Sequence, residues 1–174
     1  NDKITDKPVY TVDKTPEIYF ALKQIQQNFR KLYQIEQANR FEITNQVKCL
    51  LGDCFPKIII RTDIKEFYES IPHDKLLQKL NNDNLLTYTS KKIIAKTLMD
   101  YKTKSGNAKG VPRGVGVSAY LAELYMRDID AEIRVILNVT YYARYVDDMI
   151  IIFTPTHSST SRNFLTEIKK IVED

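Results

Sequence analysis

The chain has 174 residues, 43% of them hydrophobic, which is enough for one domain or two packed subdomains around an apolar core. Its formal net charge of +4 is mildly basic, which suits a nucleic-acid partner without requiring one. The sequence has no apolar run of membrane-spanning length, no signal peptide and no zinc-type spacing around its two cysteines, so we expect no membrane partner, no zinc site and a cytoplasmic location.

The first third of the sequence predicts two helices. Pro16 is placed as the first residue of a helix, and apolar residues recur at helical spacing from there to Leu32. Whether residues 30–37 continue this helix or form a strand stays open at this stage. A capping-box pattern beginning at Asn39 opens a second helix, which is expected to end at Gly52.

The rest of the sequence mixes short strands with helices. A β-branched apolar run over residues 56–63 is predicted to be a buried strand, and residues 141–145 and 149–153 are predicted to form a hairpin. A basic loop containing glycines is expected over residues 102–116. Further helices are predicted over residues 72–81, 90–101, 118–137 and 163–174. Without a regular alternation of strand and helix, this order indicates an α+β fold.

Three carboxylates at strand ends are the most unusual feature of the sequence. Asp147 and Asp148 lie between the two apolar strands of the hairpin, and Asp63 ends the earlier apolar strand. An Asp-Asp pair alone is common in solvated turns. Three carboxylates brought together would repel one another unless cations, such as two Mg²⁺ ions, supply a counter-charge. The pattern therefore predicts two-metal nucleotidyl transfer, with these three residues catalytic and Mn²⁺ able to replace Mg²⁺.

Three stretches of the sequence resemble motifs of reverse transcriptases. They are RTDIKEFYESIP at 61–72, KGVPRGVGVS at 109–118 and YVDD at 145–148, which are similar to motifs A, B and C and occur in the same order. Three motifs in order are a specific signature, whereas one alone would be weak. The run at 113–126 is most similar to bacterial reverse transcriptases of the retron, abortive-infection and antiphage-defence groups.

This resemblance implies the fingers and palm of a right-hand polymerase, with an antiparallel palm sheet packed on helices. Residues 1–55 would belong to the fingers, and residues 56–174 to the palm and part of the fingers–palm junction. The later palm motifs and the thumb would lie beyond residue 174, so we expect the isolated chain to polymerise weakly or not at all. The implied activity is RNA-directed DNA synthesis in the bacterial cytoplasm, from dNTPs, on an RNA template, with a DNA or protein primer.

The resemblance also implies roles for residues around the carboxylates. The Ile64 carbonyl would bind a metal ion with Asp63 and Asp147. The Tyr68 ring would lie under the incoming sugar and exclude a 2′-hydroxyl, although a core tyrosine is the alternative. Arg113 and Gly114 would contact the nucleotide.

Other residues would contact the triphosphate or the nucleic acid. Arg30 and Lys31 resemble the basic strand of retroviral fingers, which grips the triphosphate; Arg40 could serve instead, or all three could be solvated surface charges. The expected nucleic-acid contacts are Gly110, Ser118 and Tyr145, with Ser118 as a helix N-cap the alternative. Four further cations could follow a nucleic-acid backbone: Lys102, Lys104, Lys109 and Arg144.

Other functions are consistent with parts of this pattern. An abortive-infection type of polymerase would synthesise DNA without a template from a protein primer, and only an assay with and without template separates it from a templated enzyme. A non-catalytic nucleic-acid-binding palm would not need all three carboxylates. A palm-type nucleotide cyclase would not need the loop at 109–118.

Overall fold

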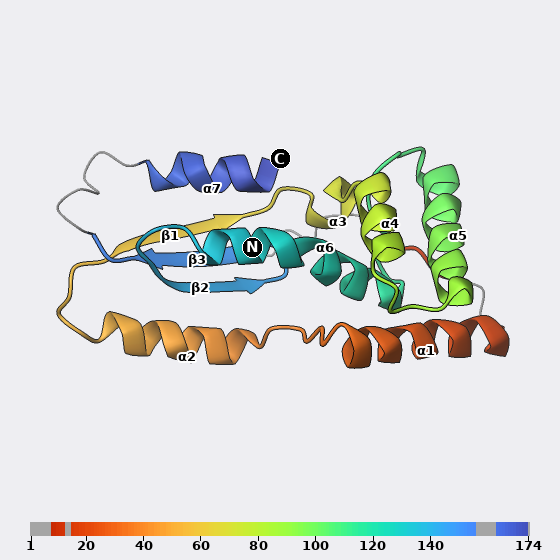
Figure 1. Cartoon of the computed structure of the whole chain (residues 1–174), viewed down its shortest axis with the longest axis horizontal. Coiled ribbons are helices and arrows are strands. Elements are labelled where there is room, and N and C mark those ends of the chain that lie inside the picture. Colours follow the sequence, from red (N-terminus) through yellow and green to blue (C-terminus); the bar gives the residue numbers. More distant parts are fainter. Residues whose placement is uncertain (1–7, 13–14, 156–162, 174) are drawn as a thin grey trace. The chain divides into compact units, whose positions relative to one another are not determined.

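The computed structural model describes residues 8–12, 15–155 and 163–173, which form two compact units. The first unit combines Asn1–Glu36 with Glu66–Tyr125, and the second combines Gln37–Lys65 with Met126–Asp174. Both are drawn in Figure 1. Within the described residues, no helix is long and apolar enough to cross a membrane.

The second unit is built on a three-stranded antiparallel sheet. Its strands are β1 (Ile58–Asp63), β2 (Val139–Tyr145) and β3 (Asp148–Phe153), in the order β1-β3-β2. The predicted hairpin is confirmed as β2 and β3. The register pairs Asp63 with Asp148, so the ends of β1 and β3 that carry carboxylates are adjacent.

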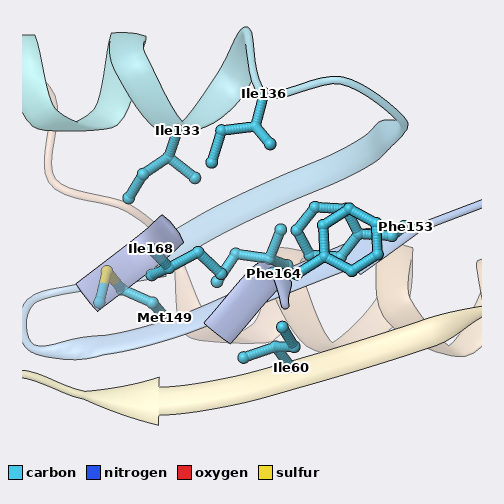
Figure 2. Close-up of a cluster of buried hydrophobic side chains, with 8 residues drawn as sticks. Ile60, Ile133, Ile136, Met149, Phe153, Phe164 and Ile168 are labelled. Carbon is cyan, nitrogen blue, oxygen red and sulfur yellow. The ribbon is translucent and has the colours of Figure 1, made fainter. Parts of the chain in front are cut away.

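Two helices cover one face of this sheet. Strand alternation sends Ile60 of β1 and Met149, Ile151 and Phe153 of β3 to this face, where they form the core. The end of α6 (Gly116–Arg134) adds Ile133, and α7 (Phe164–Glu173) adds Phe164 and Ile168. Figure 2 shows these side chains converging, and the Phe153 and Phe164 rings stack with centroids 4.1 Å apart.

The sequence prediction for β1 is correct in type but wrong in burial. The strand begins at Ile58 rather than at residue 56, and only Ile60 is buried along it. β1 is an edge strand of the described sheet, and Ile58 and Ile59 are 37% and 45% exposed. An apolar run has no period that distinguishes a central strand from an edge strand, so the sequence could not decide this.

The helix α2 (Arg40–Leu51) also belongs to the second unit. The Asn39 side chain caps it by accepting a hydrogen bond from the Phe41 N–H at 3.0 Å, and Gly52 follows its end, as predicted. Gln46 accepts a hydrogen bond from the Tyr141 hydroxyl of β2 at 2.9 Å. No residue of α2 is buried, so this helix adds little to the core of its unit.

The first unit is helical, with α1 (Pro16–Leu32), α3 (Phe67–Ser70), α4 (His73–Asn82), α5 (Tyr88–Ser105) and the first part of α6. Phe29 of α1 stacks on Tyr120 of α6, with ring centroids 6.2 Å apart. The segment that the sequence left open is helical as far as Leu32 and forms no strand beyond it.

The remaining helix boundaries differ from the predictions by a few residues. α5 continues to Ser105, four residues into the predicted loop, and Gly106 ends it in a left-handed conformation. α6 begins at Gly116 instead of residue 118 and ends at Arg134 instead of residue 137. Asp174, at the end of the last predicted helix, lies outside the described residues. Helices combined with a small antiparallel sheet confirm the α+β class.

Candidate active site

The three predicted catalytic carboxylates line one cleft in the second unit. This cleft has a volume of about 390 Å³, and the residues around it are Arg61, Thr62, Asp63, Asp147 and Asp148. Asp63 ends β1, Asp148 begins β3 as its partner in the register, and Asp147 lies in the turn between β2 and β3. The Ile64 N–H donates to the Asp147 carbonyl at 3.0 Å, which extends the contact between the two segments past the end of β1.

The chemistry of this cleft suits a hard divalent cation. Carboxylate oxygens are the ligands that Mg²⁺ prefers, and Asp63 and Asp147 are both exposed to the solvent that a metal ion would enter from. Within the described part of the chain, however, no three Asp, Glu, His or Cys side chains form a group close enough to hold a metal ion. The donors are therefore of the right kind, and their convergence on one metal site stays a prediction.

Arg61 is part of the cleft, although its place in the sequence predicted no role for it. Arg61 and Asp63 are two positions apart in β1 and so project from the same face of the sheet. The Arg61 guanidinium lies 3.2 Å from the Asp148 carboxylate, with 70% and 39% of the two side chains exposed. An ion pair this exposed contributes little to stability, but it places a positive charge beside one of the three acids.

A buried ion pair joins the end of β2, next to the turn that carries Asp147, to α6. The Arg144 guanidinium donates to both carboxylate oxygens of Asp130 of α6, at 2.9 and 2.8 Å, and both residues are 8% exposed. The Tyr142 hydroxyl donates to Asp130 at 2.7 Å, and burial together with this carboxylate raises the pKa of Tyr142, so the hydroxyl keeps its proton. The expectation that Arg144 follows a nucleic-acid backbone is wrong, because its charge is buried and paired.

The first unit brings two predicted nucleotide-binding residues together. The Arg113 guanidinium lies over the Tyr68 ring, 5.1 Å from its centroid. Glu69 accepts two hydrogen bonds from Arg113, at 2.7 and 3.2 Å. A bidentate pair of this kind fixes the plane of a guanidinium, so Glu69 determines how Arg113 faces the ring. Glu69 was not singled out in the sequence, where an acid next to Tyr68 has no distinguishing pattern.

Backbone contacts attach the loop before α6 to the segment that carries Tyr68. The Val111 N–H donates to the Tyr68 carbonyl and the Gly110 N–H to the Ile71 carbonyl, both at 2.7 Å. Gly110 is buried with a φ of 98°, and a Cβ there would lie 2.9 Å from the Glu69 Cα. Glycine is required at this position by protein packing, and its contact with nucleic acid stays a prediction.

Gly114 has a comparable constraint on the other side of the loop. Its φ is 88°, and a Cβ would lie 2.7 Å from the Tyr10 carbonyl. The Tyr10 N–H donates to the Arg113 carbonyl at 2.8 Å, so the segment at 8–12 pairs with the loop here. The loop backbone next to Arg113 therefore contacts protein on this side.

Ser118 and Arg30 lie elsewhere in the first unit. Ser118 is the third residue of α6 and 2% exposed, so it is not the helix N-cap, and its hydroxyl has no hydrogen-bond partner within the described part of the chain. Arg30 and Lys31 lie in the last turn of α1 and not on a strand, and their contact with a triphosphate stays a prediction. The Arg30 guanidinium donates to the Tyr120 hydroxyl at 2.6 Å.

The second unit pairs two other predicted residues. The Arg40 guanidinium, at the start of α2, lies over the Tyr145 ring at the end of β2, 6.0 Å from its centroid. Tyr145 is 38% exposed, so one part of its surface stays open to solvent. Cation–π contacts at exposed positions are weak, and the contact of Arg40 with a triphosphate stays a prediction.

The order of the three motifs, their carboxylate cleft and the α+β fold agree with a match to a known family. Residues 9–174 match the family model described as reverse transcriptase (RNA-dependent DNA polymerase). The chain belongs to this family.

Solved structures support the same fold assignment. A structure of apo telomerase from Candida tropicalis, truncated from its C-terminal domain, matches 91% of this reverse transcriptase chain with a TM-score of 0.57 and 16% identity. A structure of telomerase from Candida albicans, in complex with a fragment of telomeric RNA, matches 91% of the chain with a TM-score of 0.50 and 11% identity. The chain spans 36% and 31% of these two proteins, and at such identities the likeness shows the fold alone. No curated protein sequence matches significantly.

Proposed function

We propose that this reverse transcriptase chain carries the catalytic centre of an RNA-directed DNA polymerase. The observation that carries the proposal is the single cleft lined by Asp63, Asp147 and Asp148 in a chain of this family. The three acids would hold two Mg²⁺ ions, with the Ile64 carbonyl as a further ligand. Bound there, the ions would activate the primer 3′-hydroxyl and stabilise the leaving pyrophosphate.

Selection of the sugar and contact with the nucleotide are assigned to residues of the first unit. The Tyr68 ring would lie against the sugar and exclude a 2′-hydroxyl by its bulk, and Arg113 and Gly114 would contact the nucleotide. The contact of Arg113 with Tyr68 supports a joint role for the two. Arg30 or Arg40 would bind the triphosphate, and Gly110, Ser118 and Tyr145 would contact nucleic acid.

We further propose that residues 1–55 act as fingers and residues 56–174 as palm in a bacterial, cytoplasmic enzyme of the retron, abortive-infection or antiphage-defence type. Support comes from the run at 113–126, which resembles those groups. Plaque counts of phage on bacteria with the intact gene or an Asp147→Asn gene would test the defence role. Equal counts would exclude it.

Substitution of one catalytic acid tests the polymerase itself. Asp147→Asn removes a charge from the cleft at constant size, so in the intact protein we expect primer extension to fall at least about 10³-fold, since metal ions contribute several kcal/mol to such transition states. Asp128→Asn, at an exposed position of α6, is the matched control and should leave the rate unchanged. Equal activity of Asp147→Asn and wild type would contradict the assignment.

The same assay separates templated from untemplated synthesis. Extension that requires a defined RNA template, and copies its sequence, supports an RNA-directed enzyme. Extension without template, from a protein primer, would identify the abortive-infection type of polymerase instead. A protein that binds nucleic acid but incorporates no nucleotide at any Mg²⁺ or Mn²⁺ concentration would be a non-catalytic palm.

A further inference from the structure

The ion pair between Asp130 and Arg144 lies directly behind the turn that carries Asp147. Arg144 uses its Nε and one terminal nitrogen for the two Asp130 oxygens, which fixes the guanidinium in one plane. Both side chains are buried, so neither can exchange its partner for water without exposing an uncompensated charge. The pair is therefore a rigid support anchored in α6.

The remaining terminal nitrogen of Arg144 reaches the turn itself. It donates to the Val146 carbonyl at 2.8 Å. Val146 has a φ of 58°, in the left-handed region that β-branched residues avoid because their Cβ crowds the backbone. A conformation of this kind persists only where the surroundings impose it, and the hydrogen bond from Arg144 is such a constraint.

The hydrogen bond to Val146 also determines the position of Asp147. The Val146 carbonyl belongs to the peptide unit that contains the Asp147 nitrogen, so holding it orients the backbone on one side of Asp147. On the other side, the Asp147 carbonyl accepts the hydrogen bond from the Ile64 N–H at 3.0 Å. Asp147 is held between Arg144 and the end of β1, where Asp63 lies.

We propose that Arg144, oriented by Asp130, is a positioning residue that holds the Val146 turn and thereby presents Asp147 to the cleft. What Asp147 is positioned for rests on the proposed function, but the positioning itself does not. Arg144 touches neither substrate nor reacting atoms in this arrangement. Its effect passes through the backbone of the turn.

Hydrogen exchange of the Ile64 amide tests this support without any need for activity. In Arg144→Lys a charge remains to pair with Asp130, but the planar fork that reaches both Asp130 and Val146 is lost. We expect the Ile64 amide of the purified chain to exchange at least about tenfold faster, whereas core amides of β3 such as Ile151 keep their protection. Unchanged protection of Ile64 in a folded Arg144→Lys protein would overturn the proposal.

Arg134→Lys is the matched control. Arg134 is exposed at the end of α6, and its guanidinium lies 5.3 Å from the Tyr142 ring centroid, beside the same network. Its substitution should leave the exchange of Ile64 unchanged. An equal acceleration in Arg134→Lys would mean that any change near α6 loosens the turn, which would also overturn the proposal.

A measurement on the unmutated chain decides the question if Arg144→Lys does not fold. Under native conditions with rising denaturant, the Arg144 guanidinium protons and the Ile64 amide should exchange through one opening step, with the same denaturant dependence. Exchange of Ile64 while the Arg144 protons remain protected would overturn the proposal.

Kinetics of the intact protein connect the support to the reaction. Misplacement of Asp147 should lower kcat in Arg144→Lys about 10- to 100-fold, while KM for the dNTP stays unchanged. A rise in KM at constant kcat would overturn this role. If Arg144→Lys loses the protection of Ile64 and the wild-type protein does not polymerise, the positioning role of Arg144 stands. Only the proposed function is then contradicted.

Discussion

Tyr68, Glu69 and Arg113 form a contact set whose members come from two separate stretches of the chain. The Arg113 guanidinium is fixed by Glu69 and lies over the Tyr68 ring. The ion pair is partly exposed, with 33% of the Arg113 side chain and 23% of the Glu69 side chain accessible, so its contribution to stability is modest. Its value lies in orientation, because both the ring and the cation keep a defined position.

The size of Tyr68 should control which sugar the enzyme accepts. Tyr68→Val removes the ring that would meet a 2′-hydroxyl, so we expect discrimination against ribonucleotides to fall about 10- to 100-fold. The ratio of kcat/KM for a dNTP and the matching rNTP measures this in the intact protein. Tyr88→Val, at an exposed tyrosine of α5, is the control. An unchanged ratio in Tyr68→Val would make Tyr68 a packing residue.

Glu69 should influence the same ratio through Arg113. Glu69→Ala leaves Arg113 without its bidentate partner, and the guanidinium then loses its fixed place over the Tyr68 ring. We expect discrimination to relax several-fold, roughly the effect of one ordered side chain in a binding site. Glu69→Asp should restore part of it, and Glu36→Ala, at an exposed acid, none. If Glu69→Ala loses stability without any change in the ratio, the pair is only structural.

The helix α7 shows how an element with one apolar face contributes to the core of its unit. Phe164 and Ile168, four positions apart, lie on one face and are buried, whereas Leu165 is 46% exposed. The Phe164 ring stacks on the Phe153 ring of β3 (Figure 2). Packing of α7 therefore stabilises β3 directly.

Within α7, side chains of the buried face should contribute far more to the free energy of unfolding than side chains of the exposed face. Phe164→Ala removes a buried ring and leaves a cavity, so we expect the free energy of unfolding to fall by about 3–5 kcal/mol. Leu165→Ala, the neighbouring apolar residue on the exposed face, should cost only about 0.5 kcal/mol. Denaturant unfolding of both variants measures the difference. Similar losses would mean that α7 is packed on another face.

The molecule as a whole places the proposed metal ligands in one compact unit and the proposed sugar and nucleotide contacts in the other. The second unit contains the cleft with Asp63, Asp147 and Asp148, and the first contains Tyr68 and Arg113. The low net charge of +4 belongs to the first unit, which has 15 Lys and Arg against 11 Asp and Glu, whereas the second unit has 11 of each. Such a protein should bind nucleic acid through a few local cations.

Salt dependence of nucleic-acid binding tests the whole chain. We expect weak binding of a single-stranded oligonucleotide, falling about tenfold between 50 and 200 mM salt, which corresponds to only a few phosphate contacts. Lys102 and Lys104 lie exposed in the last turn of α5, so changing both to Gln should flatten this dependence. Lys48→Gln in α2 is the control. If Lys48→Gln flattens the salt dependence as much, per charge removed, as the change of Lys102 and Lys104, then overall charge and not these two lysines produces the binding.

The sequence by itself determined the motifs, the hairpin with its two acids and most of the helices. These features depend on neighbours along the chain: a strand alternates every two residues, a helix repeats every 3.6, and caps and turns need particular residue types. Asp63 opposite Asp148 follows from the strand pattern once the pairing of β1 with β3 is known.

Only the tertiary structure decided the partners and the burial of the charges. Arg144 could be read as a surface cation because nothing near it in the sequence shows that Asp130 lies beside it in α6. The same holds for Glu69 beside Arg113, and for β1 as an edge strand with Ile58 and Ile59 exposed. Contacts between distant segments decide whether a charged side chain is solvated or is buried and paired. Local sequence patterns carry no information about those contacts.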